Sequence, residues 1–518
     1  MKIERTKNAA RNIIFGILLK AYQIIVPFLM RTAIIYFMGV QYLGLSSLFI
    51  SILQVLNLVE LGVGSAMVYS MYEPIVKDDS VRICALMQLY RKYYHIIGGV
   101  IAVIGLCLTP FVPNLIKGDL PAEINVYILY LLNLLATVLS YWLFAYKNAL
   151  FQAHQRVDVT SKITLVTTTV QYVLQLIVIV FIKDYYLYVI IMLLTQALTN
   201  LLTAFCATRM YPNYVPKGKL DNQEVKKINR RIRDLFTSKI GGVVVNSADT
   251  IVISAYLGLT MLAVYQNYYY ILSSVIGLVA VVFNACTAGI GNSVIVETKK
   301  KNYHDLQKFT FLISWIAGCC ACCFLCLYQP FMRIWMGEKL MLRFPAVICF
   351  CLYYFIYEVN QLLNTYKDAA GIWHEDRFRP LVTAIVNVTL NLISVRFLGI
   401  YGVLLSTVLS MLFVGMPWLL HNLFTVLFDK EQLPGYLRSL VKYIVVVLFS
   451  CTICYLICQL FSFGEWETLF FRFAVCLVLS NAIYFSIYRK NVEFEQCVRL
   501  LDNVTKGRLH LIKYILRR

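Results

Sequence analysis

The sequence is poor in charge. Only 14% of its 518 residues are Asp, Glu, Lys or Arg, whereas soluble domains average about 25%. Hydrophobic residues make up 60%, and a soluble chain of this length would need far more polar surface to cover its cores. The composition excludes a soluble enzyme, a disordered protein and a secreted disulfide scaffold. The apolar residues form long runs that do not alternate, which also excludes an outer-membrane barrel.

Acidic residues are scarcer than basic ones. The chain has 27 Asp and Glu against 47 Lys and Arg, a formal net charge of +20. On a soluble protein this excess would suggest nucleic acid. Here the basic residues lie mostly between apolar runs, so we interpret them as topology signals that also attract anionic lipid headgroups. No nucleic acid partner is expected.

Motifs for metals, cofactors and catalysis are lacking. The densest of the 16 cysteines, Cys319 to Cys326, lie inside an apolar run with no nearby His. Small apolar side chains in a lipid-embedded helix are the favoured interpretation. There is no nucleotide-binding motif. We therefore predict no metal site, no cofactor and no catalytic residue.

Fourteen apolar runs are long enough to span a bilayer, which takes about 20 residues. They cover residues 12–38, 43–70, 93–112, 122–145, 160–182, 185–206, 239–257, 262–293, 309–328, 346–366, 380–397, 401–424, 440–460 and 467–488. If the N-terminus is cytoplasmic, the inner segments carry 38 Lys and Arg and the outer loops carry seven. This bias predicts that both termini are cytoplasmic.

An internal repeat divides the spans. Three short matches recur at offsets of 219, 220 and 220 residues, each at the same place in the order of spans. They pair Phe37-Met38-Gly39-Val40 with Tyr256-Leu257-Gly258-Leu259, Thr109-Pro110-Phe111 with Gln329-Pro330-Phe331, and Tyr146-Lys147-Asn148-Ala149 with Tyr366-Lys367-Asp368-Ala369. His154 and His374 are also in register. Each half holds six spans, so both have the same membrane orientation.

The predicted fold is an all-α polytopic membrane protein with two parallel six-helix repeats around a central cavity and two additional C-terminal helices. The predicted parts are an N-terminal lobe (1–206), a basic cytoplasmic linker (207–238), a C-terminal lobe (239–424), two further spans (425–488) and a basic cytoplasmic tail (489–518). Helical spacing within the linker, from Asp221 to Phe236, predicts a helix along the membrane surface. Two lobes around a cavity are typical of alternating-access transporters.

Several motifs carry a family resemblance over nearly the whole chain. They are Arg31 ahead of Gly39-Val40-Gln41-Tyr42-Leu43-Gly44, Glu60-Leu61-Gly62-Val63-Gly64, Asn246-Ser247-Ala248-Asp249, Trp335-Met336-Gly337, Ala370-Gly371 with Arg377 and Pro380, and Gly399-Ile400-Tyr401-Gly402. With these motifs the chain resembles the polysaccharide transport family, the Wzx-type flippases of the multidrug/oligosaccharidyl-lipid/polysaccharide exporter superfamily.

The resemblance implies a flippase of the bacterial cytoplasmic membrane. Such proteins move undecaprenyl-pyrophosphate-linked oligosaccharide units to the outer leaflet for surface or capsular polysaccharide assembly. The implied partners are this substrate, membrane lipids, and a polysaccharide polymerase or glycosyltransferases. A multidrug-exporter-like cation antiporter and a lipid II flippase stay open as alternatives. A membrane-embedded polymerase or ligase is disfavoured, because no outer loop exceeds about twenty residues or holds a catalytic cluster.

Five charged residues fall inside predicted spans, where each costs about 2.5–3.5 kcal/mol on insertion scales. They are Lys20, Arg31, Glu60, Asp249 and Glu358. Lys20 and Glu60 lie at similar depth, so an ion pair is one expectation. Arg31 could grip a pyrophosphate through two parallel hydrogen bonds or extend to the outer interface. Asp249 and Glu358 are candidates for coupling transport to protons or sodium ions.

Amide side chains share helix faces with some of these charges. Gln54 and Asn57 precede Glu60, Asn246 precedes Asp249, and Gln361 and Asn364 follow Glu358; Asn387 with Asn391 and Gln171 with Gln175 make two further pairs. In lipid such stripes should face the protein interior. Both hydrogen bonding between helices and a sugar-binding lining remain open. The candidate substrate-cavity residues are Lys20, Arg31, Glu60, Asn246, Asp249, Glu358, Gln361 and Asn387.

Overall fold

A computed structural model describes residues 5–118, 120, 121, 123–461 and 463–504. These residues form helices joined by turns, with no β-strand among them, so the all-α prediction is confirmed. The chain divides into two compact units, residues 1–266 and 267–518. Each unit is described below by itself.

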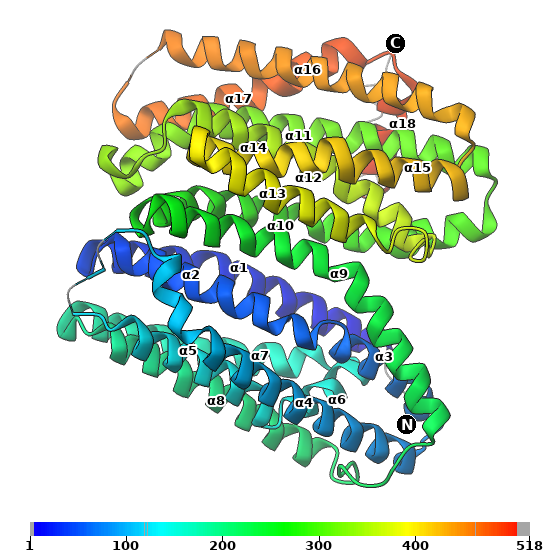
Figure 1. Cartoon of the computed structure of the whole chain (residues 1–518). Helices are drawn as coiled ribbons and strands as arrows, with labels where there is room; N and C mark the ends of the chain where they lie inside the picture. The colour runs from blue at the N-terminus through cyan, green and yellow to red at the C-terminus, as the bar shows by residue number, and fades with distance from the viewer. Residues whose placement is uncertain (1–4, 119, 122, 462, 505–518) are drawn as a thin grey trace. The chain divides into compact units, whose positions relative to one another are not determined.

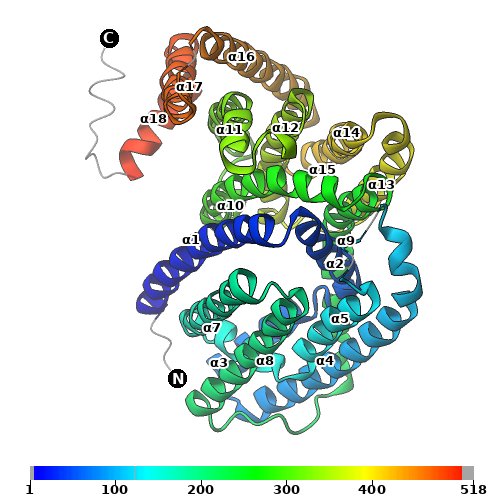
Figure 2. The same ribbon diagram turned by 90° about the vertical axis from the view of Figure 1, so that its left-hand side faces the viewer.

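The first unit is built from nine α-helices and the start of a tenth (Figure 1). They are α1 (Arg5–Phe37), α2 (Val40–Leu56), α3 (Val63–Val76), α4 (Ser80–Leu108), α5 (Val126–Trp142), α6 (Asn148–Ala153), α7 (Val157–Ile177), α8 (Tyr185–Met210), α9 (Asn222–Leu257) and the first turns of α10 (Leu259–Val296). Neighbours in the bundle are α9 with α2, α2 with α1, α1 with α7, α7 with α8, α8 with α5, and α5 with α4 (Figure 2).

The second unit contains the rest of α10 and eight further α-helices. They are α11 (Lys299–Met336), α12 (Phe344–Ala369), α13 (Arg379–Leu398), α14 (Ile400–Ser410), α15 (Met416–Val426), α16 (Leu433–Leu460), α17 (Glu465–Tyr488) and α18 (Val492–Val504). Helix α11 is central, because it packs against α12, α16, α17 and α18. The predicted tail 489–518 therefore begins with a helix, and residues 505–518 lie outside the described residues.

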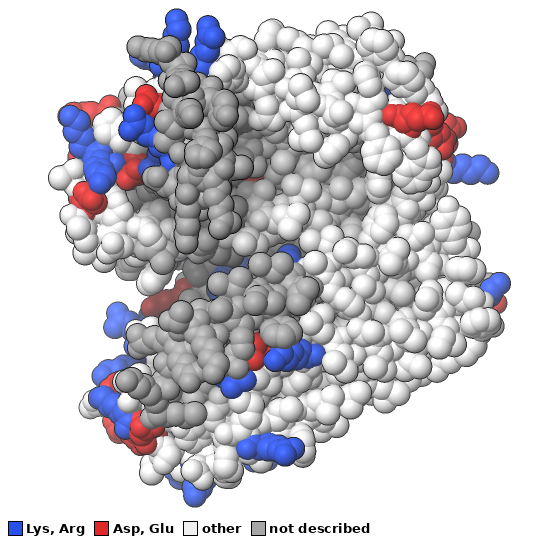
Figure 3. All heavy atoms as spheres, turned by 180° about the vertical axis from the view of Figure 1, so that it is seen from behind, with Lys and Arg blue, Asp and Glu red and all other residues white. Residues whose placement is uncertain are grey.

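Most helices are long and apolar enough to cross a membrane. Within the described residues, eleven pass by length and composition, or twelve if a bent pair counts as one span. The bend, of 49°, lies between α5 and the segment Ala145–Ala153. Each of the fourteen predicted spans overlaps a helix; the span in α5 belongs to the bent pair, and those in α1 and α10 are not among the candidates. Figure 3 shows the charged side chains of one face mostly along two opposite sides, with a broad uncharged surface between them.

The helix boundaries support the repeat. Gly39 separates α1 from α2, and Gly258 separates α9 from α10. Both have positive φ, 124° and 91°. That conformation strains residues with a Cβ, so glycine ends one helix and lets the next begin at once. Two of the repeated residues thus make the same backbone turn.

The predicted linker helix is part of one long helix. Residues 222–238 continue without interruption into the seventh predicted span and form α9. Near its start, Arg82 Nε of α4 donates to Glu224 Oε1 at 2.8 Å, and the Arg231 guanidinium stacks 4.4 Å from the Tyr69 ring. Near its end, Lys117 Nζ donates to the Tyr256 carbonyl at 2.6 Å. The first unit therefore holds α9 at both ends.

Candidate functional site

The second predicted span, 43–70, is broken in the middle. Helix α2 ends at Leu56, a 3₁₀ turn covers Asn57–Glu60, and α3 begins at Val63. Between them Leu61 is extended and Gly62 has φ 92°. The run predicted as the second span is therefore not one continuous helix, because a left-handed residue cannot continue an α-helix. A Cβ on Gly62 would lie 2.8 Å from Leu235 Cβ, so the break also lets α9 approach closely.

Glu60 lies at this break and is hydrogen-bonded. Its Oε1 accepts from the Tyr94 hydroxyl at 3.2 Å and from the Gly64 backbone N–H at 3.3 Å. Tyr94 in turn accepts from the Tyr90 hydroxyl at 2.6 Å. The positive charge of Lys239, in α9, acts on the Glu60 carboxyl. No ion pair joins Glu60 to Lys20 among the described residues, so the predicted Lys20–Glu60 contact is not found.

A pocket of about 250 Å³ with a mixed lining adjoins the break, and its apolar lining residues are Ile50, Leu53, Ala136 and Met192. Its polar lining consists of Gln54, Asn57, Asn133, Thr137, Ser140 and Gln196, from α2, the 3₁₀ turn, α5 and α8. The Tyr141 hydroxyl donates to Asn57 Oδ1 at 3.1 Å, and Ser247 Oγ of α9 donates to Gln54 Oε1 at 3.4 Å. The predicted stripe Gln54–Asn57–Glu60 therefore meets amides and hydroxyls from other helices. Such a surface can exchange hydrogen bonds with a hydroxyl-rich ligand.

The two candidate cations of α1, Lys20 and Arg31, lie in different surroundings. Lys20 is exposed. Arg31 is half-buried, between the core residues Met30 and Ile34, and its charge acts on Tyr188 of α8. Arg31 thus sits against the face of the bundle that α7 and α8 complete.

The pair Asn246 and Asp249 in α9 differs in burial. Asn246 is exposed, whereas Asp249 is buried. The next residue, Thr250, accepts a hydrogen bond from Gln266 Nε2 at 2.9 Å. Asp249 thus belongs to the interior-facing side of α9, as predicted, and Asn246 does not.

Glu358 is the most enclosed of the five charged candidates. It lies within the continuous helix α12, its exposed fraction is 1%, and neither carboxyl oxygen has a hydrogen-bond partner among the described residues. Gln361 and Asn364 lie one and two turns further along. Asn364 Oδ1 accepts from Arg379 Nη2 at 2.8 Å. Glu358 and Asn364 share a stripe, but only Asn364 has a polar partner.

Asn387 is fully buried in α13. Its Nδ2 donates to Thr407 Oγ1 of α14 at 3.0 Å, and its Oδ1 accepts from Asn391 Nδ2 at 3.3 Å. The predicted pair Asn387–Asn391 therefore faces the interior of the second unit, as expected for amides in lipid.

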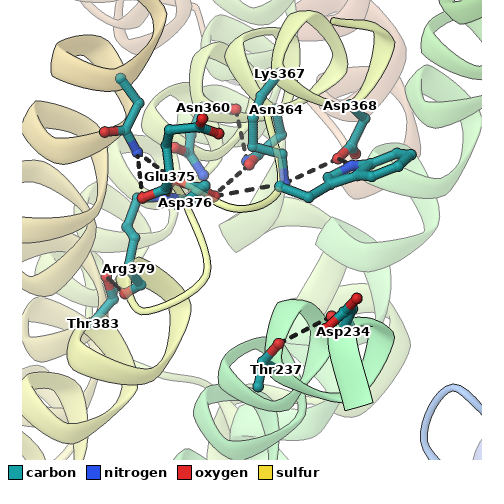
Figure 4. Close-up of polar contacts among 12 residues, drawn as sticks. Asp234, Thr237, Asn360, Asn364, Lys367, Asp368, Glu375, Asp376, Arg379 and Thr383 are labelled. Atoms are coloured by element: carbon teal, nitrogen blue, oxygen red, sulfur yellow. Dashed lines mark hydrogen bonds and ion pairs between the residues drawn. The ribbon is translucent and has the colours of Figure 1, made fainter. Parts of the chain in front are cut away.

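A buried ionic cluster ties α12, α13 and α15 together (Figure 4). Arg379 donates from Nε and Nη2 to the two oxygens of Asp376, at 2.6 and 2.8 Å. Asn422 Nδ2 donates to Asp376 Oδ1 at 3.0 Å, and Lys367 Nζ lies 3.6 Å from Oδ2. All four side chains are buried. Lys367 and Arg379 share the one carboxylate of Asp376, and Lys367 Nζ also lies 2.9 Å from Asp368 Oδ1. The cluster therefore joins three helices through paired charges.

The first unit has a counterpart at the corresponding loop. Arg156 donates from Nε and Nη2 to the two oxygens of Asp158, at 2.9 and 3.3 Å, and Lys162 lies 3.7 Å away. Asp158 is fully buried. The order of the acid and the arginine is reversed relative to Asp376 and Arg379, so sequence comparison does not align them.

Comparison with known proteins gives a likeness of fold. No protein-family model matches the chain, and no curated protein matches it in sequence. Among solved structures, the lipid II flippase MurJ in an inward closed conformation superposes with a TM-score of 0.68 at 15% identity, covering 92% of this chain and 99% of that one. The chain has the MurJ/MATE fold.

Multidrug transporters share this architecture. An inward-facing multidrug resistance MATE family transporter of the MOP superfamily superposes with a TM-score of 0.60 at 13% identity, covering 82% of this chain and 99% of that one. A mutant of the Vibrio cholerae MATE transporter VcmN gives a TM-score of 0.52 at 14% identity, covering 83% and 99%. These neighbours are flippases and transporters rather than enzymes. The protein is a multi-pass membrane protein with their fold.

Proposed function

We propose that the chain is a flippase that moves undecaprenyl-pyrophosphate-linked oligosaccharide units across the bacterial cytoplasmic membrane by alternating access. The observation that carries the proposal is the amide-lined pocket beside the helix break at Glu60. Irregular backbone at membrane depth is tolerated where it is buried or lines a cavity, and discontinuous helices form substrate sites in transporters. The likeness to MurJ supports a lipid-linked substrate.

Different candidate residues bind different parts of the substrate. Gln54, Asn57 and Asn133 offer amide donors and acceptors for sugar hydroxyls. Arg31 offers the bidentate guanidinium that suits a pyrophosphate. Lys20 adds an exposed positive charge on the same helix. The lipid tail stays in the bilayer while these groups bind the polar head.

Coupling to an ion gradient involves Asp249 and Glu358. Both are buried acidic side chains in predicted spans. Carboxylic acids that face the interior of a transporter are common proton and cation carriers. Glu358, which has no hydrogen-bond partner in the described residues, is the stronger proton candidate.

The proposal includes a setting and partners. The N- and C-termini are cytoplasmic, and the flippase works with a polysaccharide polymerase or glycosyltransferases of surface or capsular polysaccharide assembly. A lipid II flippase and a cation antiporter that exports drugs have the same fold and are the alternatives to test.

Depletion of the protein in the bacterium that encodes it separates these functions. The proposal expects undecaprenyl-linked oligosaccharides to accumulate and surface polysaccharide to disappear, measured by mass spectrometry of extracted lipids and by polysaccharide staining. Accumulation of lipid II with cell lysis would replace the proposal by the lipid II function. Unchanged lipid intermediates with increased sensitivity to cationic dyes would replace it by drug export.

A further inference from the structure

Half of the cysteines converge in one place in the second unit. Cys319, Cys322, Cys323 and Cys326 of α11 face Cys451, Cys454 and Cys458 of α16 and Cys476 of α17. Figure 2 shows these three helices side by side. The cysteines of α16 and α17 lie more than a hundred residues after those of α11. The sequence alone therefore does not show that the three sets meet.

Three of these thiols form a compact set. The Sγ atoms of Cys326, Cys458 and Cys476 all lie within 4.8 Å of one another, and all three residues are buried. A metal ion bound at about 2.3 Å from three sulfurs holds those sulfurs about 4 Å apart. The three thiols therefore need only a small contraction to ligate one ion.

The surroundings favour a soft metal. No His, Asp or Glu belongs to this set in the described residues, so every available ligand is sulfur. Further sulfur lies nearby, because the Sγ atoms of Cys322 and Cys451 are 3.5 Å apart and the Cys476 thiol donates to the Cys322 carbonyl at 3.5 Å. Thiolate-only sites select soft ions such as Cu(I), and the burial of the thiols disfavours hard ions, which keep water ligands.

A positive charge lies beside the cluster. Arg472 of α17 donates from Nη1 to the Cys326 carbonyl at 3.3 Å, and its charge acts on the Cys458 thiol. Its Nε is buried without a hydrogen-bond partner in the described residues. Three thiolates and one Cu(I) carry a net charge of −2, and a guanidinium next to them offsets part of the cost of burying it.

We propose that Cys326, Cys458 and Cys476 bind one Cu(I) ion, which clamps α16 and α17 to α11. On binding, each thiol releases its proton to solvent and forms one S–Cu bond, with no change of oxidation state. Close packing of small side chains would also explain cysteine at these positions, since a Cβ on Gly318 would approach Val447 within 2.9 Å. Packing alone, however, does not require three sulfurs to meet at one point.

The test is Cu(I) binding by the full-length protein, purified in detergent under reducing, oxygen-free conditions. Competition with a chromogenic Cu(I) chelator should give one tightly bound ion per chain, and X-ray absorption should show sulfur ligands only. The triple variant C326A/C458A/C476A should lose this ion. The control C84A/C349A/C497A, which removes three buried cysteines outside the cluster, should retain it.

A second measurement needs no variant. Cu(I) should raise the melting temperature of the unmodified protein and protect Cys326, Cys458 and Cys476 from alkylation, read by mass spectrometry. Equal copper binding by both triple variants, or failure of the reduced protein to bind copper, would overturn the proposal. Binding of zinc in preference to copper at these thiols would overturn the assignment to a monovalent ion.

Discussion

Glu60 and Glu358 look alike in the sequence, since each is an acidic residue in an apolar run with polar side chains on the same helix face. In the structure they differ. Glu60 lies where α2 gives way to α3 and accepts two hydrogen bonds, one from a tyrosine and one from the backbone. Glu358 lies within an unbroken helix, with both oxygens lacking a partner among the described residues. The comparison teaches that similar sequence surroundings do not fix a carboxyl's environment: the one at the helix break is hydrogen-bonded, and the one in the regular helix has no hydrogen-bond partner in the described residues.

The largest expected effect is on transport at the break. E60A should reduce transport at least about tenfold, because the Tyr94 O–H and the Gly64 N–H lose their shared acceptor, at about 1–3 kcal/mol each, and the helix break beside the pocket is no longer held by them. The measurement is substrate translocation in proteoliposomes. E60Q keeps the shape and one acceptor, so it should retain more activity than E60A. Full activity of E60A would remove Glu60 from the site.

Substitution of Glu358 by an apolar residue should increase the stability of the folded protein. E358L removes a polar group without a hydrogen-bond partner in the described residues from a buried position, so the free energy of unfolding should rise by about 1–3 kcal/mol. E358Q is the matched variant for coupling, since it keeps the shape but cannot exchange a proton. If Glu358 carries protons, transport by E358Q should no longer depend on the pH gradient. Destabilisation by E358L would show that Glu358 has a partner in the folded state.

A smaller effect, on the stability of the protein, is expected from substitution of Gly62 at the helix break. G62A places a Cβ at a residue with φ 92° and within 2.8 Å of Leu235 Cβ, and should cost about 1–3 kcal/mol. G99A in α4 is the control, because nothing lies within 4 Å of the added Cβ and alanine favours a helix by about 1 kcal/mol. Melting of the two variants in detergent measures the difference. Equal stabilities would mean that α9 does not need the close approach.

The smallest expected effect is on the pH dependence of folding stability, which is measured apart from the pH dependence of transport. His154 lies between α6 and α7, outside the spans, and burial lowers its pKa, although its hydrogen bond to the Leu150 carbonyl acts in the other direction. The neutral ring is favoured in the fold, so its contribution to stability is present above the unfolded pKa of about 6.5 and is lost as the pH falls below it. H154F should flatten the stability profile in this range. An unchanged profile would exclude His154 as its origin.

Much of the architecture was predictable. The length of the apolar runs predicted helices at fourteen places, and each overlaps a helix of the structure. The glycines of the repeat, Gly39 and Gly258, mark equivalent turns because only their backbone conformation ends one helix and begins the next without a loop. The amide pairs that were expected to face inward do so in α7 and α13, as Gln175 and Asn387 show.

The partners of the candidate residues were not predictable. Tyr94, Tyr141 and Lys239 come from α4, α5 and α9, and hydropathy does not tell which faces of these helices meet. The break at Asn57–Glu60 depends on Gly62 and on the approach of Leu235, more than a hundred residues away. The central cavity between two lobes stays a prediction, as do the lobe boundaries.

The length of α9 has a mechanical consequence. Thirty-six residues in one helix measure about 54 Å along the helix axis, and the Arg82–Glu224 and Lys117–Tyr256 contacts hold this helix near its two ends. A continuous helix that is held at both ends passes a displacement along its length, because its backbone hydrogen bonds resist local unwinding. A displacement of the Asn222 end of α9 would therefore reach Leu235, which lies against the turn at Gly62.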